Sequence, residues 1–348
     1  MTTRSLFFPT IVLSASLLAG CGTEEPEVDS WAESSVSSMS QATDTSSSAV
    51  ASTGIQPFLI DLSLENLATM PRSGTGFELG TIQARNADYV RYTISYLSNG
   101  VKVSGIMNIP TGDGPFPLLV LNHGYIDPSI YTNGRGLKRE QDALARRGFA
   151  VVHIDYRGHA ESDADPDPRV HARPFGYALD AVNVVEAVRN AGIPGIDTKR
   201  IGMMGHSMGG GVSLLVLTAF PEVADAVVLY APVSADAWKN FERWAVKREE
   251  GKSALEILGS RELNPELWDS ISPWSMLDRI EAPVLIFHGT ADKDVPYDWS
   301  TDLEEWLKQE GKNVRLVTYE NEGHEFGPQW NDFIESAAQF FQEQLSME

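Results

Sequence analysis

The stretch Gly205-His206-Ser207-Met208-Gly209 decides the fold. An apolar run at 201–204 precedes it, and a helix-like run at 210–220 follows it. A serine between glycines in this context predicts a sharp turn from a buried strand into a helix, which presents the hydroxyl at the positive end of that helix. A phosphate-binding loop would need a Lys-Ser or Lys-Thr ending, which this stretch lacks. Ser207 is therefore a candidate nucleophile.

Short, nearly continuous apolar runs recur along the chain on both sides of this stretch. Such runs fit strands that are buried on both faces of a parallel sheet, and helix-like stretches lie between them. Ahead of these runs, a turn at Asn99-Gly100 joins two segments in which apolar and polar residues alternate. This pattern predicts an antiparallel hairpin. The sequence predicts the α/β class, with a mixed, mostly parallel sheet of about eight strands and helices on both faces. The expected strands lie at 89–96, 101–109, 118–121, 149–154, 201–204, 226–229, 284–287 and 314–317, and the expected helices at 137–147, 178–191, 210–220 and 301–309.

A serine nucleophile needs a base within hydrogen-bond reach, and the base needs an acid that orients it. In hydrolases with such a serine turn, the three residues follow the order serine, acid, histidine. His324 lies in a polar loop between the last expected strand and the last helix, whereas His288 ends a strand, where a structural role is favoured. His324 is therefore the candidate base. Asp292 and Asp294, which both follow the strand at 284–287, are the candidate acids.

The segment His288-Gly289-Thr290-Ala291-Asp292-Lys293-Asp294-Val295-Pro296 resembles the HGxxDxxVP pattern of the prolyl-oligopeptidase-like branch of the α/β-hydrolase superfamily. The resemblance implies the α/β-hydrolase fold, with Asp292 rather than Asp294 as the acid of the triad. Asn122-His123-Gly124-Tyr125 is similar to the oxyanion loop of this family. By that match, the backbone N–H groups of Tyr125 and Met208 are expected to stabilise the developing oxyanion.

A second segment, Asp155-Tyr156-Arg157-Gly158-His159, also matches this branch. We expect a mostly structural role for it, with Arg157 supporting the active-site loops. Together with His153, its polar residues suggest metal ligands at first sight, but they do not form the H-E-x-x-H pattern of a metalloprotease helix. We expect no metal, and hydrolysis by a serine triad requires no cofactor.

The segment 231–280 is rich in aromatic residues and falls where this fold often carries a lid. Two interpretations stay open: an apolar wall for the substrate, or packing of a small helical layer onto the sheet. The aromatic residues are Trp238, Phe241, Trp244, Trp268 and Trp274.

These features predict a serine hydrolase that cleaves acyl bonds, with a carboxylic ester as the favoured substrate and a short peptide as the alternative. Family members that cut oligopeptides carry a β-propeller ahead of the hydrolase domain, whereas the segment ahead of the expected hairpin is short. Dienelactone-hydrolase-like enzymes are similar in size but usually have a cysteine nucleophile. A non-catalytic surface binding module is the alternative from a different class. The net charge of −21 argues against a nucleic-acid partner.

The start of the chain has the features of a secretory signal: Arg4, an apolar run at 6–18, and small residues before Cys21. Leu18-Ala19-Gly20-Cys21 resembles the lipobox of bacterial lipoproteins, which implies that Cys21 carries lipid. The alternative is an ordinary secreted protein with a chance cysteine. We expect a signal peptide at 1–20, a disordered, serine-rich acidic linker at 21–55 and a hydrolase domain at 56–348. The expected location is the cell envelope, at the outer membrane or cell surface and not the cytoplasm, where the lipid on Cys21 would hold the protein to a membrane.

Overall fold

The computed structural model describes residues 62–346. The expected signal peptide at 1–20, the linker at 21–55 and the lipidation of Cys21 lie outside the described residues. None of the helices within 62–346 is both long enough and apolar enough to cross a membrane.

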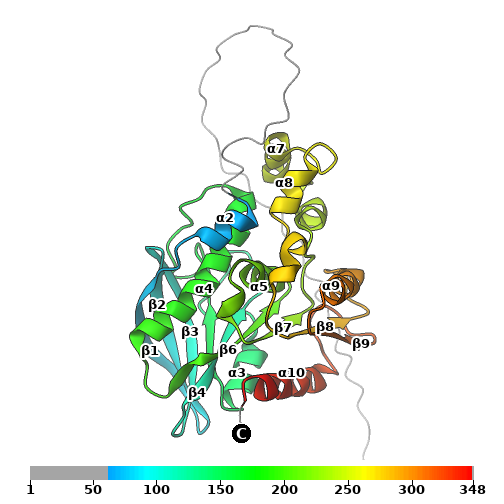
Figure 1. Cartoon of the computed structure of the whole chain (residues 1–348). Coiled ribbons are helices and arrows are strands. Elements are labelled where there is room, and N and C mark those ends of the chain that lie inside the picture. The colour runs from blue at the N-terminus through cyan, green and yellow to red at the C-terminus, as the bar shows by residue number, and fades with distance from the viewer. Residues whose placement is uncertain (1–61, 347–348) are drawn as a thin grey trace, which may run out of the picture. The chain divides into compact units, whose positions relative to one another are not determined.

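A nine-stranded sheet forms the centre of the described part of the chain, in the order β1-β2-β3-β5-β4-β6-β7-β8-β9 (Figure 1). The first three strands and the β3–β5 pair are antiparallel, whereas every pair from β5 to β9 is parallel. The mixed, mostly parallel α/β sheet expected from the sequence is confirmed. The strands are β1 (Gly74–Arg85), β2 (Tyr89–Ser98), β3 (Val101–Pro110), β4 (Phe116–Asn122), β5 (Ala150–Ile154), β6 (Ile196–His206), β7 (Ala226–Tyr230), β8 (Val284–Gly289) and β9 (Val314–Tyr319).

Strand β1 is the one strand of this sheet that the sequence analysis did not predict. It pairs with β2 at the edge of the sheet, and nearly all of its residues are exposed. A strand without a buried face shows little apolar periodicity, so its sequence gives a weak signal. The hairpin of β2 and β3 forms as predicted, with Asn99 and Gly100 at its turn, both at positive φ.

Alternate side chains of the central strands enter two separate apolar layers. Leu118 and Val120 pack in one layer with helices α4 (Arg173–Ala191) and α5 (Met208–Ala219) and with α9 (Asp298–Gln309). Leu119 and Leu121 pack in the other layer with α3 (Lys138–Ala145) and α10 (Trp330–Gln344). Helices therefore cover both faces of the sheet, as the continuous apolar runs of its strands predicted.

Helices α4 and α9 begin before the ranges expected from the sequence, at Arg173 rather than residue 178 and at Asp298 rather than residue 301. The first turn of α4 contains Pro174 and Gly176, two residues that are unfavourable inside a helix and so hide its start in the sequence. A further short helix, α2 (Leu64–Thr69), starts at Ser63, whose side chain accepts a hydrogen bond from the Asn66 N–H at 3.0 Å.

The segment between β7 and β8 forms a layer of short helices beyond the sheet, drawn in green to yellow in Figure 1. It spans the region of the aromatic residues noted in the sequence. Its helices are α6 (Ala237–Asn240), a π-helix η3 (Phe241–Ala245), α7 (Glu249–Leu258), α8 (Pro265–Ser270) and a 3₁₀ segment η4 (Pro273–Arg279).

Candidate active site

The predicted site residues lie in loops that follow the carboxyl ends of parallel strands. Ser207 follows β6, Asp292 lies in the loop after β8, and His324 lies in the loop after β9. Strand β4 leads into Tyr125 through residues 123 and 124. In open α/β sheets, this edge is where loops from neighbouring strands meet around a ligand.

Ser207 has a strained backbone at the turn between β6 and α5. Its φ of 55° and ψ of −121° are unusual for a residue other than glycine. The two flanking glycines permit the turn, because a Cβ on Gly205 would lie 2.3 Å from the Gly209 carbonyl oxygen and one on Gly209 would lie 2.0 Å from the Asn122 oxygen. The strand–turn–helix context predicted for the serine is thus present.

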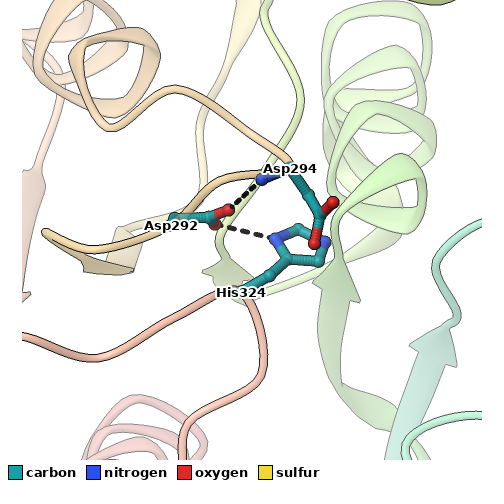
Figure 2. Close-up of side chains that lie close together, drawn as sticks. All are labelled: Asp292, Asp294 and His324. Carbon is teal, nitrogen blue, oxygen red and sulfur yellow. Dashed lines mark hydrogen bonds and ion pairs between the residues drawn. The ribbon is translucent and has the colours of Figure 1, made fainter. Parts of the chain in front are cut away.

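His324 and Asp292 form a hydrogen-bonded pair, drawn in Figure 2, with His324 Nδ1 at 2.7 Å from Asp292 Oδ2. A carboxylate only accepts hydrogen bonds, so Nδ1 carries the proton and Nε2 of the neutral ring is left as an acceptor. The backbone N–H groups of Asp294 and Val295 donate to the other oxygen, Oδ1, at 2.8 and 2.9 Å. This arrangement is that of an acid which orients a histidine base.

Hydrogen bonds keep the buried side chain of Asp292 ionised. Burial alone would raise the pKa of this carboxyl, but the hydrogen bonds from His288 and His324 outweigh it and hold the pKa well below its usual range. A carboxylate that stays ionised can stabilise the imidazolium that forms when His324 accepts a proton.

Asp294 has a different environment from Asp292. Its side chain is exposed, and its carboxylate accepts no hydrogen bond and forms no ion pair within the described part of the chain. Figure 2 shows the carboxylate beside the His324 ring, on the side away from Asp292. One ligand atom from each of Asp292, Asp294 and His324 lies within 4.8 Å of the other two. Because Asp292 Oδ2 is already engaged by His324 Nδ1, this cluster fits an acid–base pair with a neighbouring carboxylate better than a metal centre.

His206 and Glu322 position the loop that carries His324, and the sequence analysis assigned no role to either. His206 Nε2 lies 3.2 Å from the His324 carbonyl oxygen, and the two rings are 4.6 Å apart. Burial lowers the pKa of His206 to about 3, so this ring stays neutral. The buried Glu322 carboxylate accepts the backbone N–H groups of Gly327 and Gln329 at 2.8 and 2.6 Å.

The expected oxyanion donors, Tyr125 and Met208, both line the cavity that Ser207 faces. Neither backbone N–H donates to a group within residues 62–346. The backbone of Gly124 passes beside the nucleophile, since a Cβ on Gly124 would lie 3.1 Å from the Ser207 Cβ. Met208 is the first residue of α5, so its N–H points out of the positive end of a helix. Two free donors beside a serine hydroxyl fit an oxyanion hole.

A cavity of about 620 Å³ contains both Ser207 and His324 in its wall. Most of its remaining wall is apolar, and parts of that wall are deeply buried. A site of this size and character suits a small organic group held by apolar contacts. Its apolar wall includes Phe175, Val212, Leu215, Val233, Ile271 and Pro273.

The aromatic residues of the segment between β7 and β8 divide between the two roles left open by the sequence. Phe241, Trp244 and Trp268 line the cavity. Trp238 lies outside the cavity wall and packs edge-to-face on Trp268, at 4.9 Å between ring centroids. Trp274 is partly buried against the core. This segment therefore supplies part of the apolar wall and also packs on the sheet.

The Asp155–His159 segment does not line the cavity, and its side chains bond to several neighbouring segments. Arg157 and Asp180 form a buried ion pair at 2.8 Å, and the Arg157 backbone N–H donates to the same carboxylate at 2.9 Å. The Asp155 carboxylate is occupied by protein donors, which leaves it poorly suited to bind a metal. These donors are Ser104, Tyr131, Asn133 and the backbone N–H of Gly134.

Comparison with known proteins gives the chain's relatives. A model of the prolyl oligopeptidase family matches residues 136–348. The uncharacterized peptidase YtmA of Bacillus subtilis is 30% identical over 241 residues, which cover 69% of this chain and 88% of that protein. The esterase EstD of Thermotoga maritima is 27% identical, with 74% of this chain and 68% of that protein covered.

Solved structures share the same fold. The acylaminoacyl peptidase of Pyrococcus horikoshii superimposes with a TM-score of 0.62 at 21% identity, over 75% of this chain. The match covers 42% of that peptidase, so this chain corresponds to less than half of it.

Proposed function

The chain belongs to the prolyl oligopeptidase family and is a serine hydrolase, and we propose that it hydrolyses carboxylic esters with Ser207 as nucleophile, His324 as base and Asp292 as the orienting acid. The observation that carries this proposal is the hydrogen bond of 2.7 Å between His324 Nδ1 and Asp292 Oδ2, beside a cavity that also exposes the strained Ser207. A complete triad and membership of an enzyme family favour catalysis over a binding module.

The reaction follows from this geometry. His324 Nε2 takes the Ser207 proton while Oγ attacks the acyl carbon, and Asp292 stabilises the resulting imidazolium. The N–H groups of Tyr125 and Met208 stabilise the tetrahedral oxyanion, each contributing about 3 kcal/mol. His324 then protonates the leaving group, and water repeats the sequence to release the acid. A fluorophosphonate probe tests the nucleophile, because it should label Ser207 and no other serine.

We expect the purified full-length protein to hydrolyse a short-chain aryl ester with a higher kcat/KM than a matched aminoacyl amide. A phenolate leaves without prior protonation, whereas an amine must be protonated by His324 first. An enzyme overcomes the higher amide barrier by drawing on remote binding contacts, and the apolar wall offers few polar groups to hold a peptide backbone. The similarity to EstD supports this preference, and the similarity to YtmA supports the peptidase alternative.

The decisive measurement is kcat/KM for the two substrates with the same acyl group, on one preparation whose active sites are counted by fluorophosphonate titration. A higher value for the amide would place the enzyme among the peptidases. A peptide of two or three residues with a blocked amino terminus serves as a third substrate, because it adds backbone contacts without adding a charge.

We also propose that Cys21 is lipidated and that the enzyme works in the cell envelope. The lipobox-like Leu18-Ala19-Gly20-Cys21 and the serine-rich acidic stretch that follows support this. One lipid chain binds a membrane only weakly, so stable anchoring needs a second one. Cys21→Ser is expected to shift the protein from the membrane fraction to the soluble fraction or to leave it as an uncleaved precursor. Ser30→Ala, in the same stretch, is the control; normal processing and membrane association of the Cys21 variant would refute the anchor.

A further inference from the structure

A second histidine, His288, also contacts the acid of the proposed triad. It lies in β8, one residue before the strand ends, and its side chain is completely buried. Its Nε2 atom is 3.1 Å from Asp292 Oδ2, the same oxygen that accepts the hydrogen bond from His324. His288 does not line the cavity, so it acts on a substrate only through Asp292.

The partners of His288 determine where its proton lies. Nε2 also approaches the Val295 carbonyl oxygen, at 3.2 Å, and both of its partners only accept hydrogen bonds. Nε2 therefore carries the proton. Nδ1 lies 2.7 Å from Ser300 Oγ, a hydroxyl at the start of α9 that is able to donate to it. A bond donated by the buried Ser300 hydroxyl to Nδ1 fits the tautomer in which Nε2 donates to Asp292.

Asp292 consequently receives four hydrogen bonds. Two backbone N–H groups fix Oδ1, and two histidines share Oδ2. The backbone bonds set the plane of the carboxylate, and the N–H of His288 draws Oδ2 to a point between the two rings. A donor that shares Oδ2 also takes part of its negative charge, so less of that charge is left to stabilise protonated His324.

We propose that His288 is a positioning residue of this hydrolase, which fixes Asp292 Oδ2 toward His324 and tunes the basicity of that histidine by sharing its acceptor. The inference rests on the triad proposed above. It adds two side chains to that triad, His288 and its hydrogen-bond partner Ser300. Its chemical consequence is that Asp292 stabilises protonated His324 less strongly than an unshared carboxylate would.

The sign of the expected pH effect follows from this sharing. His324 must be neutral to accept the Ser207 proton, so kcat/KM falls at low pH, along the acidic limb of its pH profile. Without the His288 donor, Asp292 stabilises the imidazolium more strongly, and the acidic limb moves to higher pH. The other ionisable groups around the two histidines are unchanged by the substitution. They are Asp294 in the acid loop, Glu325 next to the base, His206 in the serine turn and Tyr297, whose ring lies 5.6 Å from that of His288.

The test compares His288→Phe, which keeps a ring and removes the donor, with His288→Gln, whose amide N–H is able to reach Oδ2. We expect His288→Phe to lower kcat about 10- to 100-fold, as loss of a partner behind a ligating histidine does in metal sites. KM should change little, and the acidic limb of kcat/KM should move up by about one pH unit. His288→Gln should restore most of the rate and the original limb. His153→Phe is the matched control, because His153 is equally buried and has no contact with Asp292.

Rates are expressed per active site counted by fluorophosphonate titration, which separates lost protein from lost catalysis. An unchanged limb and rate in His288→Phe would overturn the inference, as would a Gln variant that behaves like the Phe variant. If His288→Phe does not fold, Ser300→Ala decides, with a smaller shift of the limb in the same direction expected and an unchanged limb counting against the inference. A wild-type enzyme that the probe does not label would refute the proposed function itself.

Discussion

Ser207→Ala is expected to abolish turnover of every substrate and to leave the fold intact. The Ser207 hydroxyl, in the turn between β6 and α5, faces the cavity that His324 also lines. Loss of the serine of a comparable triad lowers kcat by about 10⁶-fold. Alanine fits the turn without a clash, because the Cβ stays and only Oγ is removed.

The rate of the Ser207 variant is measured with the aryl ester on protein free of host esterases, alongside fluorophosphonate labelling and the melting temperature. Ser129→Ala is the control, since Ser129 is exposed and lies outside both the turn and the cavity wall, and its variant should keep the rate. Residual activity above a few per cent of wild type, or labelling of the alanine variant, would rule out Ser207 as the nucleophile.

The fold was predictable where residues are buried on both faces. The six parallel strands, β4 to β9, contain continuous apolar runs because helices cover both sides of the sheet. Strand β1 escaped prediction for the opposite reason: it lies at an edge, exposes most of its residues and is held mainly by backbone pairing with β2. Pairing through the backbone does not require a periodic pattern of apolar side chains, so the sequence shows little of one.

The site was predictable to the extent that chain order and motif spacing determine it. Ser207, Asp292 and His324 follow the ends of β6, β8 and β9, and the structure brings Asp292 and His324 into hydrogen-bond contact. The surrounding contacts depend on how distant loops pack. Glu322 accepts backbone N–H groups of the loop that carries His324, and His288 in β8 contacts Ser300 in α9. The volume of the cavity likewise depends on how aromatic side chains of the segment between β7 and β8 pack.

Asp292→Asn is expected to lower kcat by about 10⁴-fold, the effect of the same change in a comparable triad. The hydrogen bonds around Asp292 explain why. Its Oδ1 accepts two backbone N–H groups, so the oxygen of an asparagine side chain would occupy that position. The NH₂ group would then face His324 Nδ1, which would have to accept the bond. The proton would move to Nε2, and the ring would no longer be able to take the proton from Ser207.

Asp294→Asn is the matched comparison, because it removes the same charge from a neighbouring position. The Asp294 carboxylate is exposed and bonds to no group in residues 62–346, so its loss alters only the local field, and we expect kcat to fall by less than about tenfold. The measurement is kcat for both variants across the pH range, with Asp292→Glu as a third variant that keeps the charge and displaces it by one methylene. If Asp294→Asn were the more damaging change, the acid of the triad would be Asp294. The Asp294 carboxylate would then have to move to His324 Nδ1, and the hydrogen bond of 2.7 Å that Nδ1 donates to Asp292 would belong to a resting arrangement of the site.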